Sequence, residues 1–471
     1  MTRVHYYANL PAVLLQCLTL LKIHIPYSFP VLKSLLYISS DPSKANTIVA
    51  LLAALLFTRF VRGWSVVTIP HILCSFFTII LVLVNYHSRV LCALSFLTWV
   101  IHAAFVAFYH HYDFPRPTGR FKAGFLYTKR KNLTFSAFYP TDEIEKPLAS
   151  LIQEKSALDK IYEVIVCFVG RIPRFLFNIL NHYMTKLKIR AHKGAKIIST
   201  YNPLFDLPQN KFIPIIFSHS IGAHANAFSS LCVELASHGY IVFCLDHSED
   251  IAGIVKDDVS ELKREYLEKR VKECRQLLDS LQDEKLLHDI FDEAVPLALD
   301  QVIIMGHSYG GAAAYLTCIG DKRIKNCILL DPYTGALKKG ELERKVHCNL
   351  VILESETWDT QQPHLEVRKR NKLIAQSQCN NGKITLYSVV GRTDHVSFMD
   401  NALFGGPMLL FTKQITYFSE VEETLELISL LVYKFVRIIA EGQRENKNTD
   451  SLVQNYLEEF GKRQTILFER S

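Results

Sequence analysis

The sequence lacks the residue patterns that mark several large classes of protein. Its eleven cysteines contain no C-x-x-C pair and no regular spacing, which disfavours zinc-binding and thioredoxin-type redox sites. The histidines show no H-x-H or H-E-x-x-H pattern, so a metal enzyme is disfavoured. No dense basic tract is interleaved with aromatic residues, and the net charge is only +7. We therefore expect no metal, no other cofactor and no nucleic-acid partner.

The length and apolar content of the chain indicate two parts of different character. The chain has 471 residues, too many for one ordinary core, and 49% of them are hydrophobic. This composition indicates an apolar part joined to a soluble part. The odd, scattered set of cysteines favours a reducing compartment for the soluble part. No internal repeat is present, and the sequence does not indicate an oligomeric state.

The N-terminal quarter contains almost no acidic side chains and several long apolar runs. Val90–Phe108 carries no formal charge and is long enough to cross a bilayer as a helix. Ser65–Tyr86 is a second such run, Ala45–Val61 is a shorter third, and Tyr6–Leu21 is either a fourth span or an interfacial helix. Three successive runs joined by short loops favour membrane spans over buried core helices. We predict a transmembrane region over residues 1–111 with three or four spans.

The basic residues that flank these runs predict the orientation of the chain. With three spans, the turn that holds Arg59 and Arg62 lies on the same side as everything after residue 110. That side carries more basic residues near the spans, so the positive-inside rule places it in the cytoplasm. A sequon at Asn132 would favour the other orientation only if it carried a glycan. The first apolar run starts late and lacks a small-residue cleavage site, which disfavours a signal peptide.

Residues 112–445 have the alternating pattern of an α/β domain, and residues 446–471 form a polar tail. Short apolar runs rich in β-branched residues alternate with helical patterns, which predicts a mostly parallel sheet covered by helices. Thr134–Tyr139 is expected to add an edge strand. The other expected strands are Phe212–Phe217, Tyr240–Leu245, Val302–Met305, Cys327–Leu330, Leu350–Leu353 and Ile384–Val390, and the expected helices include Asn226–Ser237 and Ala312–Cys318.

Two stretches interrupt this alternation. Leu148–Lys188 reads as helical and strongly apolar, either as a core helix or as a lid or membrane-surface helix. Ser260–His288 is charged and amphipathic and contains neither glycine nor proline. We predict a solvated helix for this second stretch and assign it no chemistry.

A G-x-S-x-G motif lies between an expected strand and an expected helix. The motif runs from Gly306 through Ser308 to Gly310, and small residues follow it. This context is typical of the nucleophile turn of an α/β-hydrolase, in which a sharp bend raises the serine above the sheet. The two glycines would leave room for that strained bend. The motif predicts Ser308 as a nucleophile at the carboxyl end of the sheet, where ligands of open α/β sheets bind.

A serine nucleophile needs a base, and in this fold the chain order is serine, acid, histidine. His395 follows the last expected strand, so it would lie at the carboxyl end of the sheet. His347 precedes a strand and would lie at the wrong end, and His364 stands alone in a polar loop. We therefore predict His395 as the base.

The residues leave the acid open. Asp331 follows the strand after the motif, whereas Glu354, Glu356 and Asp359 follow the next strand. Either position could reach the imidazole, because the acid has only to fix the tautomer and stabilise the imidazolium. For the oxyanion hole, one backbone N–H would come from Tyr309, directly after the nucleophile. The other would come from Ile221, in the loop after an early strand.

Several motifs together resemble the platelet-activating factor acetylhydrolases of the plasma and type II intracellular branch. The resemblance covers roughly residues 112–440. Two departures concern Ser220, which replaces a loop glycine, and the Ser248-Glu249 pair, where the family has R-D. The similar segments are Phe138-Tyr-Pro140, Phe217-Ser-His-Ser-Ile-Gly-Ala223, Leu235-Ala-Ser-His-Gly-Tyr-Ile-Val242, Asp246-His247, Lys272-Glu-Cys274, Gly306-His-Ser-Tyr-Gly-Gly311, Leu330-Asp331 and His395.

This resemblance implies a catalytic triad of Ser308, Asp331 and His395, with Ile221 and Tyr309 as oxyanion donors. It also implies calcium-independent release of a short or oxidised sn-2 acyl chain from a phospholipid. The membrane and a phospholipid substrate are thus the expected partners. A general carboxylesterase or lipase acting on neutral esters is the first alternative. A membrane scaffold with a degenerate hydrolase domain is the second, and the filled triad positions disfavour it.

Overall fold

The computed structural model describes the part of the chain that follows the predicted membrane region. The described ranges are 113–130, 133–153, 187–200, 210–247, 264–358, 366–378, 383–391, 393–404 and 421–445. Within these ranges, no helix combines the length and the apolarity that crossing a bilayer requires. The predicted spans in residues 1–111 and the polar tail lie outside the described residues, so they stay predictions.

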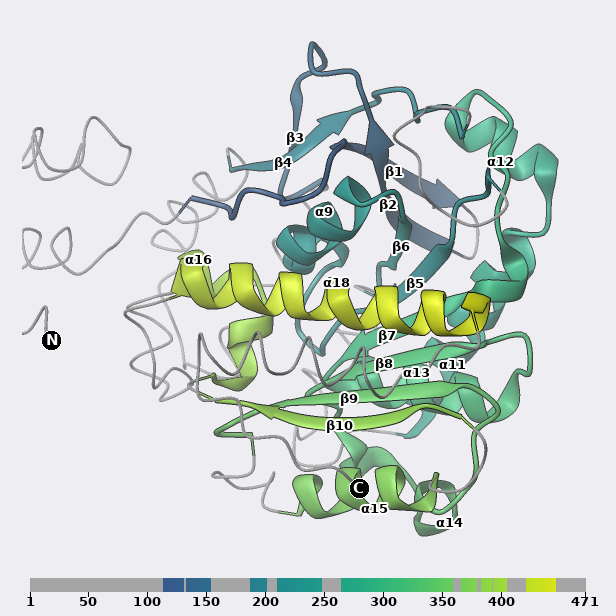
Figure 1. Cartoon of the computed structure of the whole chain (residues 1–471), viewed down its shortest axis with the longest axis vertical. Helices are drawn as coiled ribbons and strands as arrows, with labels where there is room; N and C mark the ends of the chain where they lie inside the picture. Colours follow the sequence, from purple (N-terminus) through teal and green to yellow (C-terminus); the bar gives the residue numbers. More distant parts are fainter. Residues whose placement is uncertain are drawn as a thin grey trace, which may run out of the picture. The chain divides into compact units, whose positions relative to one another are not determined.

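One ten-stranded sheet forms the centre of the described region (Figure 1). The strand order is β10-β9-β8-β7-β5-β6-β2-β1-β4-β3, and the six strands from β5 to β10 run parallel to one another. The strands are β1 (Lys122–Arg130), β2 (Leu133–Thr141), β3 (Leu148–Ser150), β4 (Lys188–Lys193), β5 (Pro214–Ser218), β6 (Ile241–Leu245), β7 (Ile303–His307), β8 (Asn326–Leu330), β9 (Asn349–Ser355) and β10 (Thr385–Val390).

The prediction of a mostly parallel sheet is confirmed, but the prediction of Thr134–Tyr139 as an edge strand is wrong. This segment lies within β2, which pairs antiparallel with both β6 and β1. Its last seven residues are buried, as expected for an interior strand covered on both faces. The sequence analysis missed β1, β3 and β4, which extend the sheet beyond β2.

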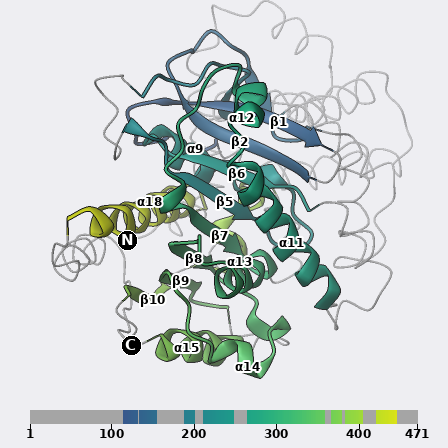
Figure 2. The same ribbon diagram turned by 90° about the vertical axis from the view of Figure 1, so that its right-hand side faces the viewer.

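Helices cover both faces of the sheet (Figure 2). Along β7, Ile303 and Met305 face one core and Ile304 faces the other, because successive side chains of a strand point to opposite faces. The first core includes α9 (Ser229–Ser237) and α18 (Val421–Glu445). The second is covered by α11 (Arg264–Ser280), α12 (Glu284–Phe291), α13 (Tyr309–Gly320), α14 (Lys339–Leu342) and α15 (Val367–Ser377).

The two interrupting stretches differ from their predicted forms. Leu148–Lys188 is not helical at its ends, because β3 begins at Leu148 and β4 begins at Lys188. The segment 154–186 lies outside the described residues. The stretch 260–288 contains two helices, α11 and the start of α12, and Asp283 caps the second through its side chain. The prediction of an amphipathic helix is confirmed for α11, which exposes Glu268 and Lys272 and buries Leu267 and Cys274, but α11 also buries the whole of Arg270, which the sequence analysis did not foresee.

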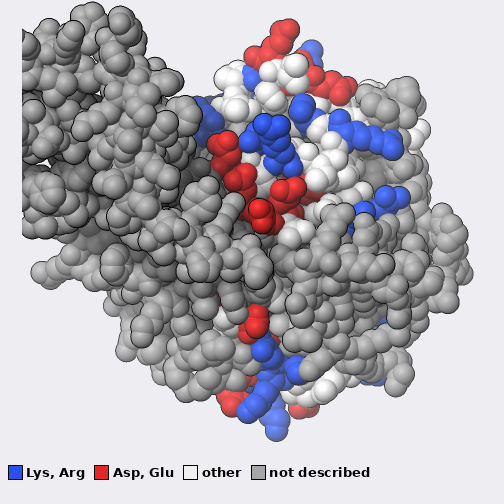
Figure 3. Space-filling view, turned by 60° about the vertical axis from the view of Figure 1, so that its left-hand side comes forward, with Lys and Arg blue, Asp and Glu red and all other residues white. Residues whose placement is uncertain are grey.

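Charges of both signs lie on the face of the molecule shown in Figure 3. Acidic side chains lie together there, with lysines and arginines beside them. Near the start of α18, burial and the carboxylates of Asp113 and Glu426 raise the pKa of Glu422, while Arg190 opposes this rise.

Candidate active site

The turn at Ser308 is as sharp as the motif predicts. β7 ends at His307 and α13 begins at Tyr309, so Ser308 alone makes the turn, with φ 57° and ψ −122°. This conformation is costly for a residue with a side chain and persists only where its surroundings hold it. The Ser308 N–H donates to the Leu330 carbonyl at 2.9 Å, and the Ser308 carbonyl accepts from the Tyr333 N–H at 2.8 Å. The segment after β8 thus holds the strained turn.

The two motif glycines lie where the turn leaves no room for a side chain. A Cβ atom at Gly306 would stand 2.2 Å from the Gly310 carbonyl oxygen. A Cβ atom at Gly310 would stand 2.1 Å from the Ser218 carbonyl oxygen at the end of β5. These positions therefore require glycine for steric reasons, as predicted from the sequence.

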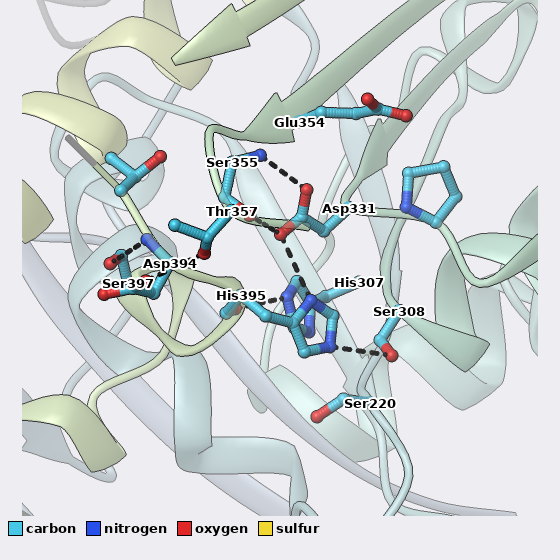
Figure 4. Close-up of polar contacts among 12 residues, drawn as sticks. Ser220, His307, Ser308, Asp331, Glu354, Ser355, Thr357, Asp394, His395 and Ser397 are labelled. Carbon is cyan, nitrogen blue, oxygen red and sulfur yellow. Dashed lines mark hydrogen bonds and ion pairs between the residues drawn. The ribbon is translucent and has the colours of Figure 1, made fainter. Parts of the chain in front are cut away.

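Three side chains from separate βα units form a hydrogen-bonded chain above the sheet (Figure 4). Ser308 Oγ and His395 Nε2 are 3.0 Å apart, and His395 Nδ1 and Asp331 Oδ2 are 3.1 Å apart. Asp331 directly follows β8, and His395 opens the short helix η5 (His395–Phe398) after β10. With Nδ1–H donating to the carboxylate, Nε2 is free to accept the serine proton.

Asp331 is buried and held from the end of β9. Its two carboxylate oxygens accept from the Ser355 N–H at 2.6 Å and the Ser355 hydroxyl at 2.5 Å. Burial raises the pKa of Asp331 to about 7, while the Ser355 hydrogen bonds and the charge of Arg368 oppose this rise. Arg368 also donates to the Ser355 carbonyl at 2.8 Å. These donors therefore keep the pKa of Asp331 lower than burial alone would make it.

The imidazole of His395 is packed between two other rings. Trp358 stacks on it with centroids 3.7 Å apart, and the His307 ring stacks at 4.5 Å. His307 Nε2–H also donates to the His395 carbonyl at 3.0 Å. Burial lowers the pKa of His307 well below its usual value, so this residue stays neutral. These contacts fix the orientation of the His395 ring, while 28% of its side chain remains exposed to a substrate.

The alternative acids and bases lie elsewhere. Glu354 is buried, points away from His395 in Figure 4, and accepts hydrogen bonds from Arg368, Asn371 and Tyr387. Glu356 is exposed, and His347 is exposed two residues before β9, at the opposite end of the sheet. His364 and Asp359 lie outside the described residues.

The two predicted oxyanion residues, Ile221 and Tyr309, follow the ends of two adjacent strands, β5 and β7. Tyr309 is the first residue of α13, where backbone N–H groups point out of the helix. Ile221 lies in the loop after β5 and is partly buried. Ser220, which stands where the resembling family has glycine, is buried and is not among the residues with positive φ. A serine therefore fits this backbone without strain.

The site also contains a group of atoms of the type that binds metal ions. The ligand-type atoms of His307, Asp331 and His395 all lie within 4.8 Å of one another, the one such group of three in the described ranges. Hydrogen bonds within the protein already engage each of the three side chains. Asp331 and His395 are brought together by the hydrogen bonds that lead to Ser308, and His307 by its hydrogen bond to the His395 carbonyl.

Sequence reasoning missed the residues that support this chain. Ser355, Trp358 and Arg368 all act on Asp331 or His395, and none belongs to a motif. Ser355 could have been found from its place at the end of β9, which neighbours β8. Trp358 and Arg368 follow β9 at irregular spacing and carry no comparable signal.

The sheet, the serine turn and the positions of the acid and the histidine define an α/β-hydrolase. A solved ferulic acid esterase from Streptomyces cinnamoneus has the same fold, with a TM-score of 0.52 and 16% identity, over 71% of this chain and 94% of that one. A family model described as "Platelet-activating factor acetylhydrolase, isoform II" matches residues 106–257 and 250–460. The chain belongs to this family, as the motifs suggested, and the family and fold together support a carboxylic ester hydrolase.

Individual members of the family are distant from this chain. The platelet-activating factor acetylhydrolase of Cavia porcellus is 24% identical over 309 residues, which is 56% of this chain and 67% of the relative. That of Gallus gallus is 21% identical over 52% of this chain and 66% of the relative. That of Bos taurus is 29% identical over 26% of this chain and 35% of the relative. The matched regions thus span about two thirds of the length of the relatives, or less.

Proposed function

We propose that this protein is a serine esterase that removes a short or oxidised sn-2 acyl chain from phospholipids. The observation that carries the proposal is the chain of hydrogen bonds from Ser308 through His395 to Asp331, at 3.0 and 3.1 Å. Membership of the platelet-activating factor acetylhydrolase family supports the choice of a phospholipid ester. The complete hydrogen-bonded chain argues against the alternative of a degenerate, non-catalytic scaffold.

In the first half of the reaction, Ser308 becomes acylated. His395 Nε2 takes the hydroxyl proton as the serine oxygen forms a bond to the ester carbonyl carbon. The carbonyl electron pair moves to its oxygen, where the N–H groups of Ile221 and Tyr309 stabilise the negative charge. Asp331 stabilises the imidazolium that forms. The bond to the glycerol oxygen then breaks, and His395 returns the proton to this oxygen, which releases a lysophospholipid.

In the second half, water removes the acyl group by the same route. His395 takes a proton from water as the water oxygen bonds to the acyl carbon, and the ester bond to Ser308 then breaks. The serine oxygen regains its proton from His395, and a free carboxylic acid leaves. Apart from water, each step uses groups of the chain alone, so we expect a chelator such as EDTA to leave the rate unchanged, in keeping with calcium independence.

We also propose that residues 1–111 anchor the enzyme in a membrane, with the hydrolase domain in the cytoplasm. The apolar runs and the flanking basic residues of the sequence support this proposal. An anchored enzyme could take its lipid substrate from the bilayer directly. Carbonate extraction should leave the full-length chain in the membrane pellet, and protease added to sealed microsomes should digest the hydrolase domain. Release by carbonate, or protection from protease, would contradict the anchor or the orientation.

A fluorophosphonate probe tests the nucleophile directly. The wild-type chain should become labelled, and Ser308→Ala should not, while Ser220→Ala serves as a control for loss of a nearby hydroxyl. Lack of labelling in a well-folded wild-type chain would favour the scaffold.

The substrate class is tested by product release. Phosphatidylcholines with acetyl, short oxidised or palmitoyl groups at sn-2 should be hydrolysed in decreasing order, and each should yield a lysophospholipid. Faster hydrolysis of triacylglycerols or simple neutral esters would instead indicate a general carboxylesterase or lipase.

A further inference from the structure

A fully buried arginine lies directly below the loop that carries Ile221. Arg270 extends from α11, and its side chain has no exposed surface. One of its guanidinium N–H groups, on Nη1, donates to the carbonyl of His219. Its guanidinium carbon also lies 5.2 Å from the centre of the Tyr309 ring. Arg270 therefore contacts Tyr309, one of the two predicted oxyanion residues, and His219, which lies two residues before the other.

The imidazole of His219 holds the next peptide group of the same loop. His219 Nδ1 lies 2.7 Å from the Ser220 carbonyl oxygen, and its Nε2 lies 2.9 Å from the His247 backbone nitrogen. A carbonyl only accepts and a backbone N–H only donates, so the proton of the ring is on Nδ1. Burial and the charge of Arg270 lower the pKa of His219 well below its usual value, which keeps this neutral tautomer.

The geometry of a trans peptide links these contacts to Ile221. The Ser220 carbonyl and the Ile221 N–H belong to one planar peptide group and point in opposite directions. A hydrogen bond from His219 that fixes this carbonyl therefore also fixes the direction of the Ile221 N–H. The Arg270 contact fixes the preceding peptide group through the His219 carbonyl in the same way. The His219–Ser220 and Ser220–Ile221 peptide groups are thus both held through their carbonyl oxygens, which leaves the Ile221 N–H pointing the other way.

We propose that Arg270, acting with His219, is a positioning residue for the oxyanion hole. This inference rests on the proposed esterase function, because only the developing negative charge on the substrate would use the Ile221 N–H. Gly222, with φ 72°, adds conformational freedom to the loop, so contacts from outside the loop are needed to hold a single orientation. A network below it, formed by Ser218, His247 and Glu273, holds His219 in turn.

Kinetics on a water-soluble ester such as p-nitrophenyl acetate test the proposal. Arg270→Met should lower kcat about tenfold to a hundredfold and leave KM within about twofold, since oxyanion contacts strengthen in the transition state. Arg270→Lys should recover part of the loss, because an ammonium can still donate to the His219 carbonyl. Arg264→Met on the same helix removes an ion pair with Glu341 and should keep the wild-type kcat.

Two measures separate positioning from a general loss of folding. Rates are expressed per active site by burst titration. His219→Ala removes the ring contacts to the Ser220 carbonyl and the His247 N–H but keeps the carbonyl that Arg270 binds, and it should reproduce the loss in kcat. Wild-type kcat per site in both Arg270→Met and His219→Ala would overturn the proposal. A wild-type chain that hydrolyses no ester would instead refute the esterase function. The positioning claim would then be judged from a crystal structure of Arg270→Met, in which an unchanged Ser220–Ile221 peptide would refute it.

Discussion

The two sides of the site next to Ser308 are built in different ways. On the acid–base side, Asp331 directly follows β8, and His395, which lies five residues beyond β10, contacts both Asp331 and Ser308. On the oxyanion side, Ile221 lies three residues beyond β5, in a loop that Arg270 and His219 hold. Asp331 is placed by the end of a strand and by its neighbour Ser355 at the end of β9, whereas the Ile221 loop is held by Arg270, which lies 51 residues from His219 along the chain. The topology of the sheet sets where a strand ends, whereas a peptide group in a loop needs separate contacts to hold its orientation.

The largest expected effect is a difference in kcat between variants of the two buried acids, Asp331 and Glu354. Asp331→Asn should lower kcat about 10⁴-fold, because an amide in place of the carboxylate favours the wrong tautomer of His395. Glu354→Gln should keep kcat within about tenfold and lower the melting temperature, since Glu354 bonds Arg368 and Tyr387 and not His395. Steady-state rates per titrated active site measure both. An equal loss of kcat in Glu354→Gln would mean that Glu354, near the end of β9, also takes part in the acid–base function.

The sequence predicted this side well because its residues follow regular features. The expected strands overlap β5 to β10, and the motif order placed Ser308 and His395 at one edge of the sheet. It could not decide between Asp331 and Glu354, because both stand at strand ends and only side-chain contacts separate them. The resemblance favoured Asp331, and in the structure this residue contacts His395.

The oxyanion side shows what a sequence pattern leaves out. The charged, amphipathic pattern of 260–288 predicted a solvated helix. Nothing in that pattern distinguished Arg270 from the other charged residues of the helix. An arginine enters a core when its charge and donors are satisfied there, and such pairing depends on residues distant in sequence. No spacing rule connects Arg270 to His219. The same reason explains why β4 was missed, since it pairs with β1, which lies far away along the chain.

A smaller effect is expected from the support of Asp331. Ser355→Ala removes the hydroxyl that stabilises the carboxylate, so the pKa of Asp331 should rise further above about 7. The charged form is the active one, and the acidic limb of the kcat/KM profile should therefore move to higher pH. The loss should be several-fold near pH 6 and should fade toward pH 9. Asp331 and His395 interact, so the midpoint of the acidic limb is an apparent pKa of the pair and not of either residue alone.

A serine of the neighbouring loop provides the control for this profile. Ser397 accepts from the Asp394 N–H at 2.9 Å and, among the described residues, forms no hydrogen bond to Asp331. Ser397→Ala should therefore leave the midpoint of the acidic limb unchanged. Equal shifts in both variants would show that the profile reports loop disturbance and not the carboxylate of Asp331.

The smallest expected effect tests whether the oxyanion side needs the glycine that its family carries. Ser220→Gly should change kcat by less than about twofold, because His219 and Arg270 already hold the peptide and Ser220 has no positive φ to relieve. Stability should fall by about 0.5 to 1 kcal/mol, since glycine gives the unfolded chain more freedom. Ser220→Ala keeps that restriction and should match wild type in both kcat and urea unfolding. A gain of tenfold or more in Ser220→Gly would mean that the serine holds the loop in a poor geometry and that the Arg270 and His219 contacts do not determine it.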